Sequence, residues 1–458
     1  MTWLARNAAP LGIAAATYVL AVGFPGGDPD TWWHLASGRW MVEHRALLRE
    51  DIFSFTIDGR PYSVGEWLGQ VAIWLAYAAG GWQGIAVLRG LLVGLAGFFL
   101  ARAARRLGAP WGATIPVVLL ALALSKQSWT DRPQLFTLAL FPFALDLMLA
   151  ARAGDRRALF AFPVLILLWT NLHGGYALGL GLVLAFAVEA FAQRRPDARA
   201  FALCAALSVG ASFLDPGALG IGGAASHVLS PPRFITEEMA PDLVTPAGFV
   251  FMAFLAATIA GALLLGGSLL EVLLLVPVLW LSLSAQRHLP YFAFVATPFL
   301  AVKVARLASR LPVRRGRQYP LPDAARAALA LALVAGAVVV TPTAPAEPDE
   351  RAYPVELLDR IRASDAALLH EYDWGGWLIW RAPERPVFVD GRLFPFMPAV
   401  LNDYVEAVSL GPAWKEVLDR HGIREVLLRP KRPLAVALRE LGWVERARGR
   451  DAVILARP

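Results

Sequence analysis

Two aspartates one residue apart follow the first apolar run of the chain, in the segment Gly27-Asp28-Pro29-Asp30-Thr31-Trp32-Trp33-His34. Carboxylates at the boundary of an apolar segment are costly unless they are solvated, paired or bound to a cation. Asp28 and Asp30 could hold a divalent cation such as Mg²⁺ or Mn²⁺, and either could be the general base for an attacking hydroxyl. The alternative is a solvated Asp-Pro turn in which Asp30 is a helix N-cap and the tryptophan pair is an interfacial anchor.

Cationic side chains occur in several other loops. Arg132 lies at the entry to a helix, Arg233 follows two prolines, and Arg287 and His288 are adjacent. Arginine beside a helix N-terminus suits a phosphate group, so we expect these four residues to bind an anionic ligand. The alternatives are that Asp131 and Arg132 neutralise each other and that the other cations contact lipid headgroups.

A third set of residues could contact a substrate. Glu66 opens an apolar segment, His173 precedes two glycines, and Asp373 and Trp374 belong to Glu371-Tyr372-Asp373-Trp374-Gly375-Gly376-Trp377. We expect substrate contacts from His34, Glu66, His173, Asp373 and Trp374. In the alternative interpretation, Glu66 caps a helix N-terminus, His173 caps a helix C-terminus, and the segment around Asp373 is a structural turn.

The composition shows what kind of chain carries these residues. Of 458 residues, 57% are hydrophobic and only 17% are charged, and the mean hydropathy is +0.52. Soluble domains have about 45–50% apolar and about 25% charged residues, so the composition excludes an ordinary soluble enzyme and a disordered chain. The net charge of +7 comes from short basic blocks between apolar runs, which does not indicate nucleic-acid binding. A single cysteine, Cys204, excludes an intrachain disulfide framework and a cysteine-based metal site.

We predict about eleven membrane-spanning helices, because a span needs roughly 20 apolar residues. The runs are Ala8–Phe24, Gly84–Ala101, Trp111–Ser125, Pro133–Ala151, Leu159–Leu172, Tyr176–Ala192, Ala200–Leu214, Phe249–Leu265, Leu269–Ala285, Leu289–Val304 and Ala324–Val340. The first run has no convincing cleavage site and is expected to be an uncleaved anchor.

The short apolar segment Glu66–Gly80 is predicted to lie along the membrane surface. Cytoplasmic loops collect Lys and Arg, and only this arrangement puts the four basic blocks on the side of the N-terminus. The blocks begin at Arg102, Arg152, Arg194 and Lys303. The N-terminus is then inside, and the unusual polar residues and the C-terminal tail are outside.

The tail beyond the proline-rich linker at 342–352 has balanced charges and short apolar runs. It is predicted to be a small α/β domain over residues 353–458, outside a spanning domain at 1–341 whose first external loop is 25–83. Expected strands are Ala367–Glu371, Pro386–Asp390, Glu425–Arg429 and Asp451–Ala456, and expected helices are Tyr353–Ala363, Trp414–His421 and Leu434–Leu441.

Together these features resemble the GT-C superfamily of integral-membrane glycosyltransferases. The segment Gly27-Asp28-Pro29-Asp30-Thr31-Trp32-Trp33-His34-Leu35-Ala36 is similar to the first-loop motif of oligosaccharyltransferase catalytic subunits, where the acid that Asp28 would match binds a divalent metal. Tyr372-Asp373-Trp374-Gly375-Gly376-Trp377-Leu378 looks like a variant of their WWDYG acceptor motif, with Glu371, Tyr372 and Trp374 as the departures. The Asp-Glu pair of the protein-mannosyltransferase and aminoarabinose-transferase branch is absent, although Glu66–Gly80 followed by Gly84–Ala101 resembles that branch.

The resemblance implies a cell-envelope enzyme of the bacterial inner membrane. It would move a sugar from a polyprenyl-phosphate-linked donor to an acceptor on the extracytoplasmic face, with membrane lipids and the lipid-linked donor as partners and no nucleic acid. One alternative is a transporter or flippase for lipid-linked glycans, which would need charges near the middle of the spans. A second alternative is a non-catalytic scaffold whose tail is a binding module.

Overall fold

The computed structural model describes residues 2–62, 64–216, 239–310, 322–341 and 348–458. Arg233, which we predicted to bind phosphate, and most of the predicted linker lie outside the described residues. The chain divides into two compact units, which we describe separately. The helical unit comprises Met1–Phe24 and Gln83–Ala346, and the loop–tail unit comprises Pro25–Trp82 and Glu347–Pro458.

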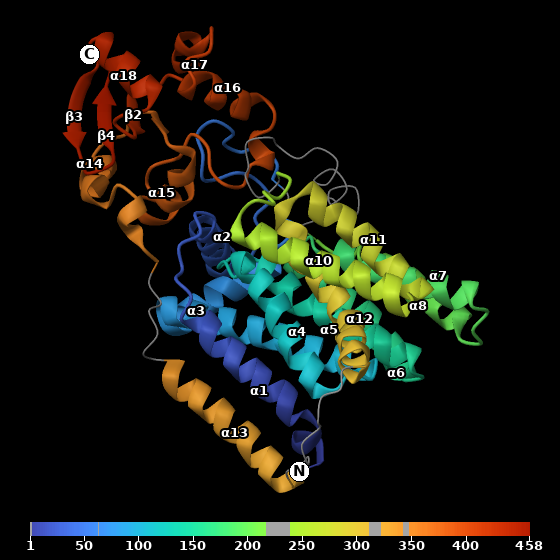
Figure 1. The fold of residues 1–458 in the computed structure, drawn as a ribbon. Coiled ribbons are helices and arrows are strands. Elements are labelled where there is room, and N and C mark those ends of the chain that lie inside the picture. Colours follow the sequence, from blue (N-terminus) through green and yellow to red (C-terminus); the bar gives the residue numbers. More distant parts are fainter. Residues whose placement is uncertain (1, 63, 217–238, 311–321, 342–347) are drawn as a thin grey trace. The chain divides into compact units, whose positions relative to one another are not determined.

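The helical unit consists of packed helices, and α1 and α13 lie side by side along their lengths (Figure 1). All eleven predicted apolar runs are helical. Their helices are α1 (Thr2–Val22), α3 (Trp67–Arg106), α4 (Trp111–Leu124), α5 (Gln134–Arg152), α6 (Arg156–Leu172), α7 (Tyr176–Ala192), α8 (Ala198–Ala211), α10 (Pro246–Leu265), α11 (Leu269–Ser284), α12 (Leu289–Arg310) and α13 (Asp323–Val340). Short 3-10 turns, η1 (Lys126–Ser128) and η3 (Gln286–His288), precede α5 and α12. Within the described residues, five helical segments have the length and apolarity needed to cross a membrane, and four further apolar helices are shorter.

The basic turns after α3, α5 and α7 meet at one end of the helical unit. Arg106 Nε bonds Asp146 Oδ1 at 2.5 Å, and Arg152 Nη2 bonds Glu189 Oε1 at 2.8 Å. Arg195 Nη2 in turn donates to the carbonyl of Arg152 at 2.9 Å. These contacts neutralise the buried carboxylates and bring three of the predicted basic blocks together.

Helix α3 is broken where it passes from one unit to the other. Gly81 has φ +58° and ψ −145°, a conformation that L side chains disfavour, and Gly80 is also non-helical. Upstream of this kink the helix packs within the loop–tail unit, where the Trp74 and Tyr77 rings contact the Trp380 ring. The Gly80-Gly81 pair therefore separates Trp67–Ala79 from the apolar helix that follows.

The tail contains a four-stranded sheet with the order β1-β2-β4-β3. Strands β1 (Leu368–His370) and β2 (Glu425–Leu428) are parallel, whereas β4 (Val453–Ala456) runs antiparallel to β2 and to β3 (Val444–Arg448). Strands β2 and β4 are fully buried and apolar except for Glu425, which is paired with Arg360 and Arg385, while β3 carries charged, exposed side chains that suit an edge strand. The other elements of the unit are α2 (Thr31–His44), η5 (Glu350–Ala352), η6 (Val355–Leu357), α14 (Leu358–Arg362), η7 (Tyr372–Trp374), α15 (Gly375–Arg381), η8 (Phe394–Phe396), α16 (Ala399–Val408), α17 (Trp414–Arg420) and α18 (Pro433–Glu440).

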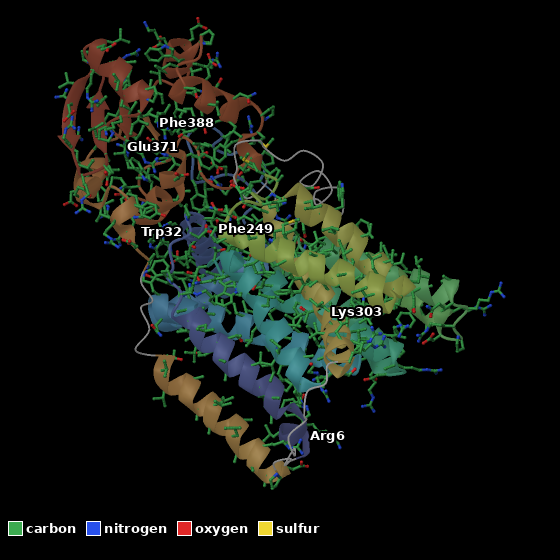
Figure 2. The ribbon with its side chains drawn as sticks, viewed as in Figure 1. Arg6, Trp32, Phe249, Lys303, Glu371 and Phe388 are labelled. Atoms are coloured by element: carbon green, nitrogen blue, oxygen red, sulfur yellow. The ribbon has the colours of Figure 1, made fainter. Side chains whose placement is uncertain are left out.

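The first loop completes the core of the tail. Trp32 and Trp33 of α2 are 1% and 5% exposed and pack with Tyr353, Trp374 and Trp377 (Figure 2). The expectation that this tryptophan pair is an interfacial anchor is therefore wrong, because both rings lie inside the core of the loop–tail unit. The expected strand Pro386–Asp390 is also wrong as a sheet member: it forms only an isolated bridge, between Ser54 of the loop and Val387.

A fully buried ion cluster ties the loop to the tail. Arg392 Nη1 lies 2.5 Å from Asp51 Oδ1, and its Nη2 and Nε bond Asp390 at 2.6 and 2.8 Å. Asp51 also accepts hydrogen bonds from the backbone and hydroxyl of Ser54. Burial opposes the charge on Arg392, but the two carboxylates raise the pKa of the guanidinium above its ordinary value.

Replacing Arg392 should release the tail from the first loop. Arg392→Met leaves two carboxylates buried without their cation, and breaking a buried pair in this way costs about 3–5 kcal/mol. We expect a lower midpoint for thermal unfolding of the purified protein and faster amide exchange over residues 51–56 and 386–393. Arg420→Met, which removes an exposed cation paired with Asp403, is the matched control and should change neither measurement.

Candidate functional site

The acidic loop begins α2 with a geometry that differs from an ordinary helix cap. The backbone N–H of Asp30 donates to Asp28 Oδ1 at 2.9 Å, and the N–H of Thr31 donates to the Asp28 carbonyl at 3.1 Å. Asp30 occupies the N-cap position, yet its side chain accepts no cap hydrogen bond. Instead Asp30 Oδ1 accepts the Trp33 indole N–H at 3.1 Å. The Asp30 carboxylate is thus oriented by a buried aromatic residue, and both aspartates remain half-buried.

Two glycines of the tail, Gly376 and Gly391, allow its backbone to approach this loop, and a third, Gly375, allows close packing within the tail. A Cβ on Gly391 would overlap Asp30 Oδ1, and a Cβ on Gly376 would lie 2.7 Å from the Pro29 carbonyl oxygen. A Cβ on Gly375 would overlap the Val389 carbonyl, which belongs to the segment leading to Asp390. Close packing therefore explains the Gly375-Gly376 pair. The same close packing brings the acidic loop and the tail motif into contact.

Two tyrosines connect the acids of the loop and the tail electrostatically. Burial raises the pKa of Tyr353, the hydrogen bond with Trp32 opposes the shift, and Asp28, Asp373 and Asp30 add to it, so that the pKa is about 12. Burial likewise raises the pKa of Tyr372 well above its ordinary value, with Asp30, Asp390 and Asp373 adding to the effect. Asp28, Asp30 and Asp373 therefore act on the same small region of the loop–tail unit, and Asp373 is largely exposed there.

His34 and Glu66, both predicted to contact substrate, lie together in this unit. His34 is 3% exposed, its Nδ1 is 3.3 Å from Gln70 Nε2 and 3.7 Å from Glu66 Oε1, and its ring stacks on Trp33. Because the Trp33 indole also donates a hydrogen bond to Asp30, the His34 ring helps to position the Asp30 carboxylate through Trp33. Glu66 is the partly exposed member of this group.

The rest of the tail motif is structural. Glu371 is buried and is held by Arg432 and by the backbone N–H of Arg429 at 2.9 Å. Trp374 is 1% exposed, and its Nε1 donates to the Ala352 carbonyl at 3.0 Å. This gives Trp374 a packing role in place of the predicted substrate contact, so we leave it out of the proposed site.

The predicted phosphate-binding residues belong to the helical unit. The Tyr291 hydroxyl, which hydrogen-bonds the Gln134 side chain, interacts electrostatically with both Arg132 and Arg287. His288 is anchored by a contact of 3.2 Å between Nδ1 and the Leu281 carbonyl, and its ring lies 6.4 Å from that of Tyr291. Arg132, Arg287 and His288 are thus grouped around Tyr291 at the start of α12.

The neighbouring Asp131 has a buried partner from another helix. Arg89 of α3 bonds both Asp131 oxygens, at 2.6 and 2.7 Å, and donates to the carbonyls of Ala21 and Phe24 at the end of α1. Both side chains of this ion pair are almost completely buried. The pair fixes the turn before α5, where Arg132 lies.

His173 closes the C-terminus of α6, as the capping alternative predicted. Its backbone N–H donates to the Trp169 carbonyl, and its Nδ1 accepts the Gly175 N–H at 3.0 Å. The same ring nitrogen lies 2.8 Å from Thr137 Oγ1, and a Cβ on Gly175 would overlap this hydroxyl. These bonds fix the ring orientation, and a substrate contact by His173 stays a prediction.

Asp28 and Asp30 are the residues that could hold a divalent cation. Among the described residues there is no cluster of three or more histidine, cysteine or acidic side chains of the kind that forms a dedicated metal cage. Mg²⁺, however, usually keeps several waters and is held by one or two carboxylates together with substrate phosphates. Two neighbouring half-buried carboxylates fit that smaller requirement.

Sequence reasoning missed the residues that hold the site in place. Arg89, Gln70, Asp390, Gly391 and Arg392 were not predicted to belong to it. A charged residue within an apolar run, such as Arg89, was the one available signal of a buried partner. Nothing local marks Asp51 as the partner of Arg392, because 340 positions separate them in the chain.

The stability of the loop–tail unit should depend on pH through His370. This ring is completely buried, with Nδ1 2.9 Å from the Glu371 carbonyl and Nε2 accepting the Phe388 N–H, and burial lowers its pKa to about 4. The unfolded chain binds a proton near pH 6.5, so the neutral ring stabilises the fold above that pH and this contribution is lost as the pH falls towards 4. The full loss is roughly 3 kcal/mol. The protection factor of the Phe388 amide, which is corrected for the intrinsic exchange rate at each pH, should fall between pH 6.5 and 5 in the native protein and much less in His370→Asn.

Comparisons with known proteins complete this description. No protein-family model matches the chain, and no curated protein is similar to it in sequence. The archaeal oligosaccharyltransferase AglB from Archaeoglobus fulgidus, solved with an inhibitory peptide and a dolichol-phosphate, is similar in structure with a TM-score of 0.61 at 13% identity. The match covers 92% of this chain and 69% of that one. The apo form of the A. fulgidus enzyme gives 0.58 at 12% identity over the same shares.

A second similar structure is ArnT from Cupriavidus metallidurans in the apo state. Its TM-score is 0.54 at 15% identity, and the match covers 98% of this chain and 97% of that one. At these identities the likeness is one of fold. The chain therefore resembles the GT-C glycosyltransferases in its fold, as its sequence motifs predicted.

Proposed function

We propose that this protein is an integral-membrane glycosyltransferase that uses a polyprenyl-phosphate-linked sugar. The observation that carries the proposal is the convergence of Asp28, Asp30 and Asp373 on one region of a unit built jointly by the first loop and the tail. The resemblance in fold to AglB and ArnT supports the same class of enzyme. AglB is described as bound to a dolichol-phosphate, which is the type of carrier that the proposal requires.

In the proposed reaction, an acceptor hydroxyl attacks the anomeric carbon of the donor sugar. A new C–O bond forms, the bond between the sugar and the phosphate oxygen breaks, and polyprenyl phosphate leaves. Asp28 or Asp30 accepts the hydroxyl proton as general base, with Trp33 orienting Asp30. A divalent cation bound by Asp28 and Asp30 would supply additional positive charge.

Cations of the helical unit would neutralise the donor phosphate. Arg132, Arg287 and His288 are grouped around Tyr291, and Arg233 is the fourth predicted contributor. Fixed positive charge stabilises a leaving phosphate without reorganisation during the reaction. Glu66, His173 and Asp373 are proposed to contact the acceptor or another part of the substrate, and the buried His34 ring is proposed to act on Asp30 through Trp33.

The loop–tail unit also restricts the topology that we propose. Residues 25–82 and 347–458 pack as one unit, so both must occupy the same aqueous compartment. The number of membrane crossings between them must therefore be even. In the described parts of the chain between Gln83 and Val340, ten apolar helices satisfy this condition, and with α1 they give the eleven spans that we propose. Following the charge rule, we propose that the N-terminus is cytoplasmic and that the acidic loop and the tail domain at 353–458 are extracytoplasmic, in a bacterial inner membrane.

The alternatives are less well supported by the buried charges. A transporter would need ionisable groups available within the spans. Arg89, Asp146, Glu189 and Glu271 are each buried in ion pairs, with Asp131, Arg106, Arg152 and Lys303 respectively. These groups neutralise one another, which is typical of structural pairs.

The proposed topology can be tested by labelling single cysteines. In a Cys204→Ala background, Asp58→Cys in the loop and Lys431→Cys in the tail should both react with an impermeant maleimide added from outside to intact cells. Arg156→Cys, in a basic turn, should react only after the membrane is opened. Opposite labelling of positions 58 and 431 would contradict the shared compartment.

The proposed chemistry can be tested with purified protein, a panel of radiolabelled polyprenyl-phosphate sugars and a membrane extract as the source of acceptor. We expect release of polyprenyl phosphate to fall about 10²–10⁴-fold in Asp28→Asn and Asp30→Asn, because each loses the group proposed to take the proton. Asp58→Asn changes an exposed acid of the same loop and should retain full activity. If the native protein moves the lipid across liposomes without consuming it, and both variants do the same, the protein is a flippase.

A further inference from the structure

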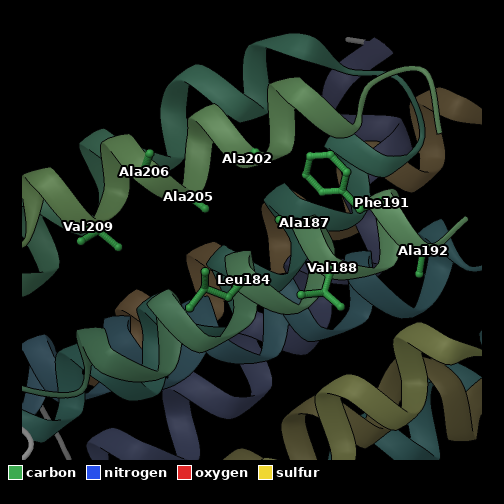
Figure 3. Close-up of a pocket in the computed structure, with 9 residues that line it drawn as sticks. All are labelled: Leu184, Ala187, Val188, Phe191, Ala192, Ala202, Ala205, Ala206 and Val209. Atoms are coloured by element: carbon green, nitrogen blue, oxygen red, sulfur yellow. The ribbon is translucent and has the colours of Figure 1, made fainter. Parts of the chain in front are cut away.

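An apolar groove lies between α7 and α8 in the described part of the helical unit (Figure 3). Its volume is about 910 Å³, and it lies among Leu184, Val188 and Phe191 of α7 and Ala202, Ala206 and Val209 of α8. The groove exists because several of its lining residues are alanines, which leave space where larger side chains would fill the gap. No residue of the proposed glycosyltransferase site takes part in it.

The groove faces away from the protein core and is long enough for an extended hydrocarbon chain. Leu184, Val188 and Phe191 are each about half exposed, at 47%, 51% and 54%. From Leu184 to Ala192 the helix rises by roughly 12 Å at 1.5 Å per residue. A linear acyl chain can lie along a slot of this length.

One end of the groove is strongly cationic. Ala192 precedes Arg194 by two positions, and Arg199 lies one helical turn before Ala202 on the same face of α8. Arg194 and Arg199 are both exposed, whereas the neighbouring Arg195 is paired with Asp197. Asp197 does not cap α8 through its side chain, so the N-terminus of that helix adds further positive potential.

We infer that this groove binds an anionic phospholipid, with an acyl chain between α7 and α8 and the phosphate on Arg194 and Arg199. Charge complementarity selects this occupant. A second copy of the chain related by a two-fold axis would bring two such arginine clusters together, and like charges facing each other are unfavourable. The site lies in the leaflet that adjoins the basic turns and does not depend on the proposed glycosyl transfer.

The test is native mass spectrometry of the purified, delipidated full chain with added phosphatidylglycerol or phosphatidylcholine of identical acyl chains. The native protein should prefer phosphatidylglycerol. Each cationic side chain near a membrane surface changes anionic-lipid affinity about fivefold, so Arg194→Gln/Arg199→Gln should weaken phosphatidylglycerol binding roughly 25-fold and leave phosphatidylcholine binding unchanged. Arg310→Gln, at an exposed arginine at the end of α12, is the matched control.

The apolar half of the site is tested by filling the groove. Ala206→Phe should weaken both lipids, whereas Ala256→Phe, at an exposed alanine of α10, should weaken neither. An unchanged midpoint of thermal unfolding would establish that both variants are folded. If Ala206→Phe does not fold, Ala202→Leu takes its place as the variant that fills the groove. Equal affinity for the two lipids, or phosphatidylglycerol affinity insensitive to the arginine variants, would overturn the inference. A dimer that Ala206→Phe dissociates would assign the groove to a second copy.

Discussion

A guanidinium buried between two carboxylates holds the loop–tail unit together. Arg392 contacts Asp390 within its own turn and Asp51 in a loop from the other end of the chain. Removing three charged groups from water is costly, and the cost is recovered only when all of them meet with good geometry. Each charge of the cluster is therefore compensated only when the first loop is packed against the tail. The cluster in this way favours that one arrangement of the two segments.

The position of Asp30 depends on the ion cluster of Asp51, Asp390 and Arg392. Asp390 and Arg392 flank Gly391, and Gly391 is the residue whose missing side chain makes room for the Asp30 carboxylate. On the other side, Trp33 holds the same carboxylate and is itself packed against His34. The acid is thus positioned by the first loop and the tail together. In the helical unit, buried pairs such as Arg89 with Asp131 similarly connect turns of different helices.

The sequence was most informative where the physical signal is local. Apolar runs of span length became helices, and Gly80-Gly81 marked the end of the segment predicted to lie on the surface. The tail was recognisable as a small α/β domain, although β3, α15 and α16 were not predicted. Their short lengths and mixed polarity carry little periodicity.

The long-range contacts could not be predicted from local patterns. The tryptophan pair was interpreted as an interfacial anchor because indoles favour that environment, yet the pair is buried by partners more than 300 positions away. Trp374 was predicted to contact a substrate, whereas its side chain packs in the core of the loop–tail unit. From the sequence, the acidic loop and the glycine-rich tail motif were assigned to the same reaction. That Gly376 and Gly391 are the residues at which the two segments meet was not predicted, because nothing in the sequence distinguishes these glycines from others.

The order in which the chain is made gives this arrangement a further consequence. The first loop emerges from the ribosome early, but its core partners follow only after some three hundred more residues have been synthesised. During that interval Trp32, Trp33 and Asp51 lack their partners from the tail, so the two indoles are not yet buried by it. Folding of the loop–tail unit can therefore be completed only after Arg392 and the strands that follow it have been synthesised.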